Sequence, residues 1–190
     1  MNIIRGSGTS GLKGITPLRD NIYIKPLIDI SRDEIEEYCK KEKLNPRHDK
    51  TNDENVYTRN KIRNILIPTI KREFNPNIID TIDRLSKLAD KENDYFDEKI
   101  KEVYKNIIVQ ESSKEIILNL KEFNKEHNVI KSKLILYTIK KLLGGTNGIE
   151  KIHIDDIIKL CENNIGNKYL TPNKHIKILV NKGKMYFFVT

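Results

Sequence analysis

The chain has 190 residues, of which 37% are hydrophobic and 33% are charged, and its formal net charge is +8. Periodic apolar residues at this length exclude a disordered chain and predict one or two domains. With two cysteines and no apolar run of roughly 20 residues, a disulfide framework and a membrane-spanning helix are also excluded. We therefore expect a cytoplasmic protein. The positive charge favours a polyanionic partner, although a composition rich in Lys and Asn explains it equally well.

Residues 6–14 predict a glycine-rich loop. Gly6, Gly8 and Gly11 match the G-x-G-x-x-G pattern of dinucleotide-binding sites. That pattern requires a complete strand before it and a long helix after it. Here only four residues precede Arg5, and residues 13–17 cannot extend a helix. We therefore expect a turn between two elements and not a nicotinamide site.

A short strand and a capped helix follow this loop. Residues 21–24 alternate as a strand. Ser31 and Glu34 have the spacing of a capping box, which predicts a helix beginning there. The stripe expected to be buried on this helix comprises Ile35, Tyr38, Cys39 and Leu44.

Residues 45–56 form a polar loop that leads to a second helix. This helix opens at Thr58 or one residue earlier, and Pro68 is expected to kink it or to begin a fresh turn. Asn75 is a predicted N-cap for the next segment. The apolar spacing of residues 78–107 then predicts one long helix or two stacked helices.

The C-terminal third mixes strands with helices. We predict a strand at residues 116–120, a helix at 129–143 that Gly144 and the following glycine terminate, a helix at 155–163, and a β-hairpin at 175–189. The acidic pair that opens the 155–163 helix is interpreted as its cap and not as an acid–base pair.

Arg59 and Arg63 are candidates for phosphate contact. They lie four residues apart near the start of the second helix and so project from one face. Guanidinium groups arranged in this way suit bidentate contact with phosphates. The alternative is a solvated face on which they pair with Asp49, Asp53 or Glu54. Spacing alone leaves both interpretations open.

The four histidines have no metal-ligand spacing, so no metal site is predicted. They are His48, His127, His153 and His175.

Several segments of the first 77 residues form an ordered series. Residues 5–15 read RGSGTSGLKGI. After them come Lys25-Pro26-Leu27, the Ser-capped helix SRDEIEEYCKKEKL, the loop with Asp49, Thr51 and Asn52, YTRNKIR at 57–63, Pro68 and Asn75-Pro76-Asn77. The first segment resembles, almost letter for letter, a signature of the tRNA(Ile)-lysidine synthetases of the PP-loop ATPase superfamily, and the others follow in that family's order.

This resemblance implies a fold class and a domain division. Residues 1–74 would be an α/β remnant, the C-terminal part of a Rossmann-like PP-loop nucleotide-binding domain. Residues 75–190 would form a mostly α-helical tRNA- and substrate-binding domain with a terminal β-hairpin. The family's pyrophosphate-binding loop, Ser-Gly-Gly-x-Asp-Ser, does not occur in this sequence. The chain is therefore expected to be a fragment that is inactive by itself.

The resemblance also implies a reaction. The whole enzyme would join free lysine to the wobble cytidine of a tRNA(Ile) with a CAU anticodon, through an adenylated tRNA and with ATP and Mg²⁺ as cofactors. The resemblance leaves open whether the enzyme is a homodimer. The alternatives are a stand-alone tRNA-binding or adaptor module and an inactive truncated gene product.

Site residues are carried over from the same resemblance. Arg59 and Arg63 would act in catalysis. Nucleotide or tRNA binding is expected of Arg5, Gly6, Gly8 and Asn60, and a supporting loop of Asp49 and Asn52. The lysines expected to contact tRNA phosphates from the 129–143 helix are Lys131, Lys133, Lys140 and Lys141.

Overall fold

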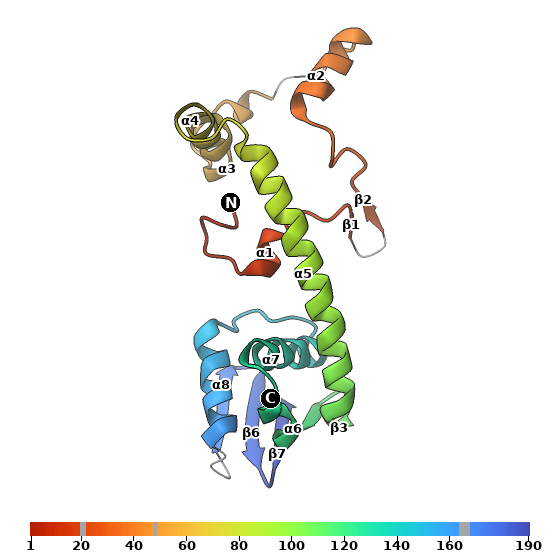
Figure 1. The fold of residues 1–190 in the computed structure, drawn as a ribbon, viewed down its shortest axis with the longest axis vertical. Coiled ribbons are helices and arrows are strands. Elements are labelled where there is room, and N and C mark those ends of the chain that lie inside the picture. Colours follow the sequence, from red (N-terminus) through yellow and green to blue (C-terminus); the bar gives the residue numbers. More distant parts are fainter. Residues whose placement is uncertain (20–21, 48, 164–167) are drawn as a thin grey trace. The chain divides into compact units, whose positions relative to one another are not determined.

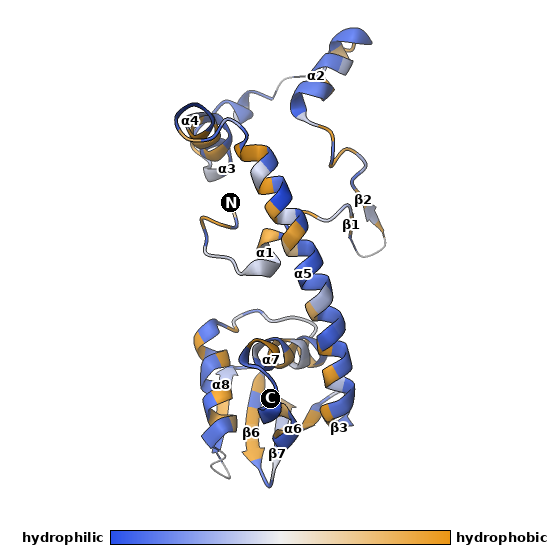
Figure 2. Cartoon of the chain, in the orientation of Figure 1, coloured by the Kyte–Doolittle hydropathy of each residue, from blue (hydrophilic) through white to orange (hydrophobic). Residues whose placement is uncertain are grey.

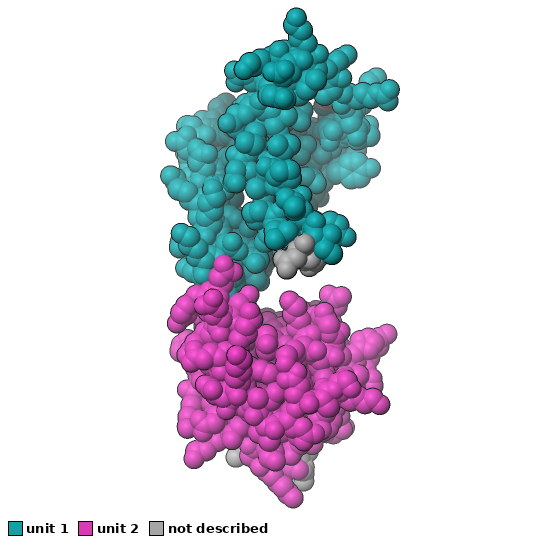
Figure 3. All heavy atoms as spheres, turned by 90° about the vertical axis from the view of Figure 1, so that its right-hand side faces the viewer, with its two compact units in different colours: residues 1–93 teal, residues 94–190 magenta. Residues whose placement is uncertain are grey.

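The computed structural model describes residues 1–19, 22–47, 49–163 and 168–190. It consists of two compact units, residues 1–93 and residues 94–190, which are described separately (Figure 3). The boundary lies inside the 30-residue helix α5 (Ile78–Ile107). The 78–107 segment is thus one helix and not two.

The described part of the first unit contains short helices and a two-stranded ribbon (Figure 1). Before α5, its elements are α1 (Thr9–Leu12), β1 (Leu18–Arg19), β2 (Tyr23–Ile24), α2 (Arg32–Lys41), the 3₁₀ turn η1 (Lys50–Asn52), α3 (Thr58–Lys61), the π-helical turn η2 (Ile62–Leu66) and α4 (Ile67–Glu73). Strands β1 and β2 pair antiparallel. The strand predicted at 21–24 corresponds to β2, and Asn21 lies outside the described residues.

The capping box that begins α2 is confirmed. The Ser31 hydroxyl accepts from the Glu34 amide at 3.2 Å, and the Glu34 carboxylate accepts from the Ser31 amide at 2.7 Å. The predicted buried stripe is wrong, because Tyr38 is 60% exposed and Leu44 is 54% exposed. Figure 2 shows that α2 is mainly hydrophilic. A cap fixes where a helix begins, but its apolar residues become buried only where another element packs against them.

Pro68 has the predicted effect on the second helix. It has no N–H to donate, and its ring clashes with the carbonyl group four residues earlier in a regular α-helix. The chain avoids that clash through η2, in which the Ile67 amide donates to the Ile62 carbonyl, five residues back. Pro68 then lies in the first turn of α4.

Asn75 holds the turn that precedes α5. Its side-chain oxygen accepts from the Asn77 amide at 2.9 Å, with Pro76 between them. Because α5 begins at Ile78, Asn75 and Pro76 lie before the helix, whereas the prediction placed the cap at Asn75 and Pro76 in the first turn.

The described residues of the second unit form a five-stranded antiparallel sheet with helices packed on one face. After α5, the elements are β3 (Ile108–Glu111), β4 (Glu115–Asn119), α6 (Leu120–Lys125), α7 (Asn128–Leu143), α8 (Lys151–Asn163), β5 (Lys168–Asn173), β6 (Ile176–Asn181) and β7 (Lys184–Val189). The strand order is β3-β4-β7-β6-β5. The core joins alternate residues of β4, β6 and β7 to the apolar faces of α7, α8 and the end of α5.

The predicted hairpin is confirmed and forms part of this larger sheet. Lys182 and Gly183 make its turn with φ values of 46° and 72°, as a tight hairpin turn requires. The strand predicted at 116–120 is β4, whereas β3 and β5 were not predicted.

Helix α7 ends as expected at Gly144, which has a φ of 74°. Helix α8 begins at Lys151, four residues before Asp155. The prediction that Asp155 and Asp156 cap it is therefore wrong, because both lie inside the helix. Asp156 instead lies 3.8 Å from the Lys159 ammonium.

Candidate nucleotide site

The glycine-rich loop of the first unit is held against one face of α5. The Ser86 hydroxyl donates to the Lys13 carbonyl at 2.9 Å, and the Asn93 amide donates to the Thr9 carbonyl at 3.0 Å. Between them, Asp90 lies 3.5 Å from the Lys13 ammonium. Residues 86, 90 and 93 share one helix face. Asn93 is only 5% exposed, so water competes little for its hydrogen bond to the loop.

The loop's own backbone explains its glycine spacing. Gly6 has a φ of +71°, a conformation that side chains rarely adopt. Gly8 is the N-cap of α1. A Cβ atom added to Gly11 would lie 2.4 Å from the Cβ of Ser7, so only glycine fits there without a shift. The Asn2 side chain also donates to the Gly11 carbonyl at 2.7 Å.

A pocket of about 510 Å³ lies between this loop, α3 and α5. Its described walls are mostly apolar, and Arg59 contributes their only charged side chain. The other lining residues are Met1, Asn2, Ile3, Gly11, Leu12, Gly14, Ile15, Ile82, Leu85 and Ser86. Small-molecule sites commonly combine apolar walls with a few polar groups that fix the ligand's orientation.

The structure brings Arg59 to this pocket but does not place Arg63 on its lining. Both side chains are exposed. Arg59 thus lies where an anionic group in the pocket can contact it, and the roles of both arginines stay predictions.

Asn60 is buried and holds the loop that precedes α3. Its side-chain amide donates to the carbonyl groups of Thr51 and Glu54, each at 2.8 Å, and the residue is 7% exposed. One turn later, the Asn64 amide donates to the Asn52 carbonyl at 3.1 Å. Asn60 and Asn64 thus fasten the loop to one helix face, and contact between Asn60 and a nucleotide or tRNA stays a prediction.

Asp49 organises the same loop from its beginning. One carboxylate oxygen accepts from the Thr51 amide at 3.0 Å and from the Thr51 hydroxyl at 2.8 Å. This contact caps η1, which ends at Asn52. Asp49 and Asn52 therefore lie in a loop that supports α3, the helix that carries Arg59.

Three further predicted residues do not line the pocket, namely Gly6 and Gly8 in the glycine-rich loop and Arg5 directly before it. Sequence reasoning missed the apolar wall residues, among them Ile82 and Leu85. Their three-residue spacing on α5 was visible, but it indicates a buried face and not the element packed on it.

The lysines of α7 differ in their surroundings. The prediction that Lys131 contacts phosphate is wrong, because Lys131 is 5% exposed and its ammonium lies 2.9 Å from the Glu162 carboxylate. Lys133 lies over the Phe96 ring, 4.7 Å from its centroid. Lys141 pairs with Glu111. These contacts leave Lys140, which is exposed, as the least constrained of the four.

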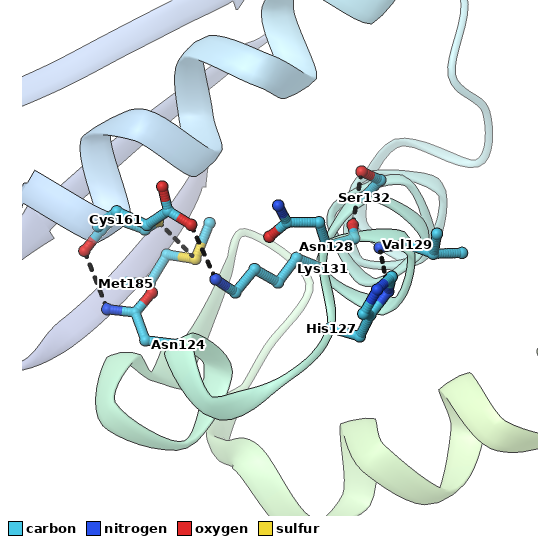
Figure 4. Close-up of polar contacts among 9 residues, drawn as sticks. Asn124, His127, Asn128, Val129, Lys131, Ser132, Cys161 and Met185 are labelled. Atoms are coloured by element: carbon cyan, nitrogen blue, oxygen red, sulfur yellow. Dashed lines mark hydrogen bonds and ion pairs between the residues drawn. The ribbon is translucent and has the colours of Figure 1, made fainter.

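A buried thiol, that of Cys161, lies near the Lys131 ammonium (Figure 4). The sulfur of Cys161 lies 3.6 Å from that of Met185, and its carbonyl accepts from the Asn124 side chain at 3.0 Å. Burial raises the pKa of the Cys161 thiol to about 12. Cys161 is therefore a core residue and not a nucleophile.

Among the described residues, no group of three or more His, Cys, Asp or Glu side chains could hold a metal ion. His48, one of the four histidines considered above, lies outside the described residues. No described helix is long and apolar enough to cross a membrane.

Comparisons with known proteins agree with the resemblance seen in the sequence. Residues 1–70 match a family model described as a PP-loop domain. The chain is 42% identical to a tRNA(Ile)-lysidine synthase of Clostridioides difficile over 182 residues, which cover 96% of the chain and 39% of that protein. For the Clostridium acetobutylicum protein of the same name the identity is 43%, covering 91% of the chain and 37% of that protein. For the Clostridium tetani protein it is 39%, covering 99% and 40%.

The chain thus spans about 40% of the length of the curated relatives it matches. The matches extend through both compact units, and three relatives with the same name agree. The chain belongs to the tRNA(Ile)-lysidine synthase family.

Proposed function

We propose that this chain is part of a ligase that joins free lysine to the wobble cytidine of a tRNA(Ile) with a CAU anticodon. The observation that carries the proposal is the 42% identity over 96% of the chain to a protein named for this activity. The match to a PP-loop domain supports ATP as the source of energy. The proposed setting is the cytoplasm.

The proposed chemistry has two steps. The C2 carbonyl oxygen of the cytidine bonds to the α-phosphorus of ATP, and pyrophosphate leaves. The amino group of lysine then attacks C2, the bond from C2 to the adenylate oxygen breaks, and AMP leaves. Negative charge must be stabilised in the first step as pyrophosphate departs, which is the task that arginine performs well.

Arg59 is the proposed charge-stabilising residue. It lines the pocket beside the glycine-rich loop and supplies the charged side chain among the described lining residues. Arg63, one turn along the same helix, is proposed to contact phosphate from outside the pocket. Arg5, Gly6 and Gly8 are proposed to offer the anion backbone amides and a further positive charge from the loop.

Mg²⁺ would neutralise the phosphates of ATP when bound. Because no suitable cluster occurs among the described residues, we assign no step to the ion here. We propose that its ligands come from the part of the family's length that this chain does not span.

A chimera tests the proposal. The matching 182 residues of the C. difficile relative are replaced by this chain, and transfer of radiolabelled lysine to a tRNA(Ile) transcript is measured with and without ATP. ATP-dependent transfer is expected. A chimera that folds and binds tRNA but transfers no lysine would contradict ligase activity and favour a tRNA-binding module.

A further inference from the structure

The sheet of the second unit has one face that the helices leave uncovered. In β6 and β7, buried residues alternate with half-buried or exposed ones, and the buried set packs into the core. Strand pairing then identifies the other set. Tyr186, Leu179 and Tyr169 lie opposite one another in successive strands and so form a row on the outer face. Ile117 on β4 pairs with Tyr186 and continues the row, but it is only 7% exposed. We call this surface the open face.

The open face carries aromatic rings in contact geometries. Tyr186 and Phe188 are two residues apart on β7, and their rings are nearly parallel, with centroids 5.9 Å apart and 7° between the planes. Tyr169 is 58% exposed, and the Lys177 ammonium lies 3.9 Å from its ring centroid. Aromatic side chains on a solvent-facing sheet cost hydration free energy unless a partner covers them.

The charge of this region has a single sign. Residues 168–190, which contain β5, β6 and β7, include five lysines and no Asp or Glu. Lys177 pairs with Phe188 across the strands and so shares the open face, as does Lys184, which pairs with Asn181. Glu115, opposite Phe188 on β4, is the acidic residue nearest to them in register. This pattern complements a polyanion that also has planar groups.

We propose that the open face binds unpaired nucleotides of RNA, with bases stacked on Tyr186, Phe188 and Tyr169 and phosphates contacting Lys177 and Lys184. RNA bound to a sheet combines these two interactions, since stacking holds the bases and lysines hold the backbone. A second copy of the chain fits less well, because a symmetric contact would bring the lysines of one open face against those of the other. The choice of RNA as partner rests on the proposed function.

The test measures binding of the whole chain to a fluorescein-labelled single-stranded RNA of about 12 nucleotides, a length within the usual range for one binding sheet. Fluorescence anisotropy is recorded across a salt series. Tyr186→Ala and Phe188→Ala should each weaken binding about tenfold. Tyr186→Phe keeps the ring and should stay within about twofold of the wild type. Lys177→Ala should lower the slope of log affinity against log salt concentration by about one, the change expected when one phosphate contact is lost.

Matched controls lie outside the open face. Tyr95 is 65% exposed on α5, and Lys159 is 71% exposed on α8. Tyr95→Ala and Lys159→Ala should leave the affinity unchanged, and circular dichroism checks that every variant is folded. Losses in these controls equal to those of Tyr186→Ala and Lys177→Ala would overturn the proposal.

Two further outcomes would also overturn the proposal that the open face binds unpaired nucleotides. Sedimentation could show that the wild-type chain is a dimer that Tyr186→Ala dissociates without loss of RNA affinity, which would assign the open face to self-association and overturn the proposal. Binding that an unlabelled RNA duplex displaces as well as a single strand does would overturn the stacking of unpaired bases. Because the assay detects binding and not lysine transfer, its result is independent of whether the chimera is active.

Discussion

Asn60 provides a direct test of how the loop before α3 is held. The Asn60→Ala substitution removes two hydrogen bonds, both 2.8 Å long, from a side chain that is 7% exposed. At a net contribution of about 0.5–1.5 kcal/mol for each bond, the expected loss is about 1–3 kcal/mol. Asn64→Ala also removes two hydrogen bonds, but these are longer, 3.1 Å each, and come from an exposed side chain. Water can replace the donor there, so the cost should stay near 0.5 kcal/mol or below.

The loss should appear as local opening, so the assay is native-state hydrogen exchange of residues 49–64, supported by limited proteolysis. We expect Asn60→Ala to speed exchange in the loop about 5- to 150-fold, the equivalent of 1–3 kcal/mol. Exchange in α7, which belongs to the other unit, serves as the internal reference. Equal effects of Asn60→Ala and Asn64→Ala would refute the anchoring role of the buried amide.

The remaining predictions concern the second unit. Glu162→Gln should lower its free energy of unfolding by about 1–3 kcal/mol, because it leaves the buried Lys131 ammonium without its anion. Lys131→Met should cost less than about 1 kcal/mol, since it removes the charge and keeps the packing volume. Urea denaturation followed by circular dichroism measures the unfolding free energy of both variants. A larger loss for Lys131→Met than for Glu162→Gln would contradict the ion-pair interpretation. Because the pKa of Cys161 is raised to about 12, iodoacetamide at neutral pH should label the half-buried Cys39 and reach Cys161 only after denaturation. Equal labelling rates in the native chain would show that Cys161 is accessible.

Features fixed by neighbouring residues could be predicted from the sequence. The capping box at Ser31 and the stop at Gly144 each depend on contacts within one or two turns. The hairpin turn at Lys182 and Gly183 is equally local. Each of these positions needs a particular backbone conformation or a side-chain acceptor that few residue types supply.

Features fixed by distant partners could not be predicted in this way. β3 follows α5 without a break, so its apolar residues continue the helical pattern. β5 contains Pro172 and lies at the edge of the sheet, where the alternation of its side chains is weak. The burial of Lys131 depends on Glu162 in another helix, and an isolated lysine on α7 gives no sign of that partner.

The candidate site also combines features that the local sequence predicts with features that depend on distant partners. The sequence identified Arg59 as a candidate, while its position on the pocket depends on α5 and the glycine-rich loop meeting through Ser86 and Asn93. Asn60, predicted to bind a ligand, makes its described contacts with the loop. A motif residue can thus serve the site by supporting its scaffold, and only the hydrogen-bond partners reveal this.

The central claim is that Arg59 stabilises charge at a nucleotide site of a lysine-transferring ligase. Single-turnover lysine transfer by the chimera, measured alongside thermal melting, tests it most directly. We predict that Arg59→Ala lowers the rate about a hundredfold, equivalent to roughly 3 kcal/mol of transition-state stabilisation, with little change in Tm because the side chain is exposed. Arg59→Lys should stay strongly impaired, since an ammonium group lacks the planar fork. Near-normal transfer by Arg59→Ala, or a rate loss accompanied by a collapse of Tm, would contradict the claim.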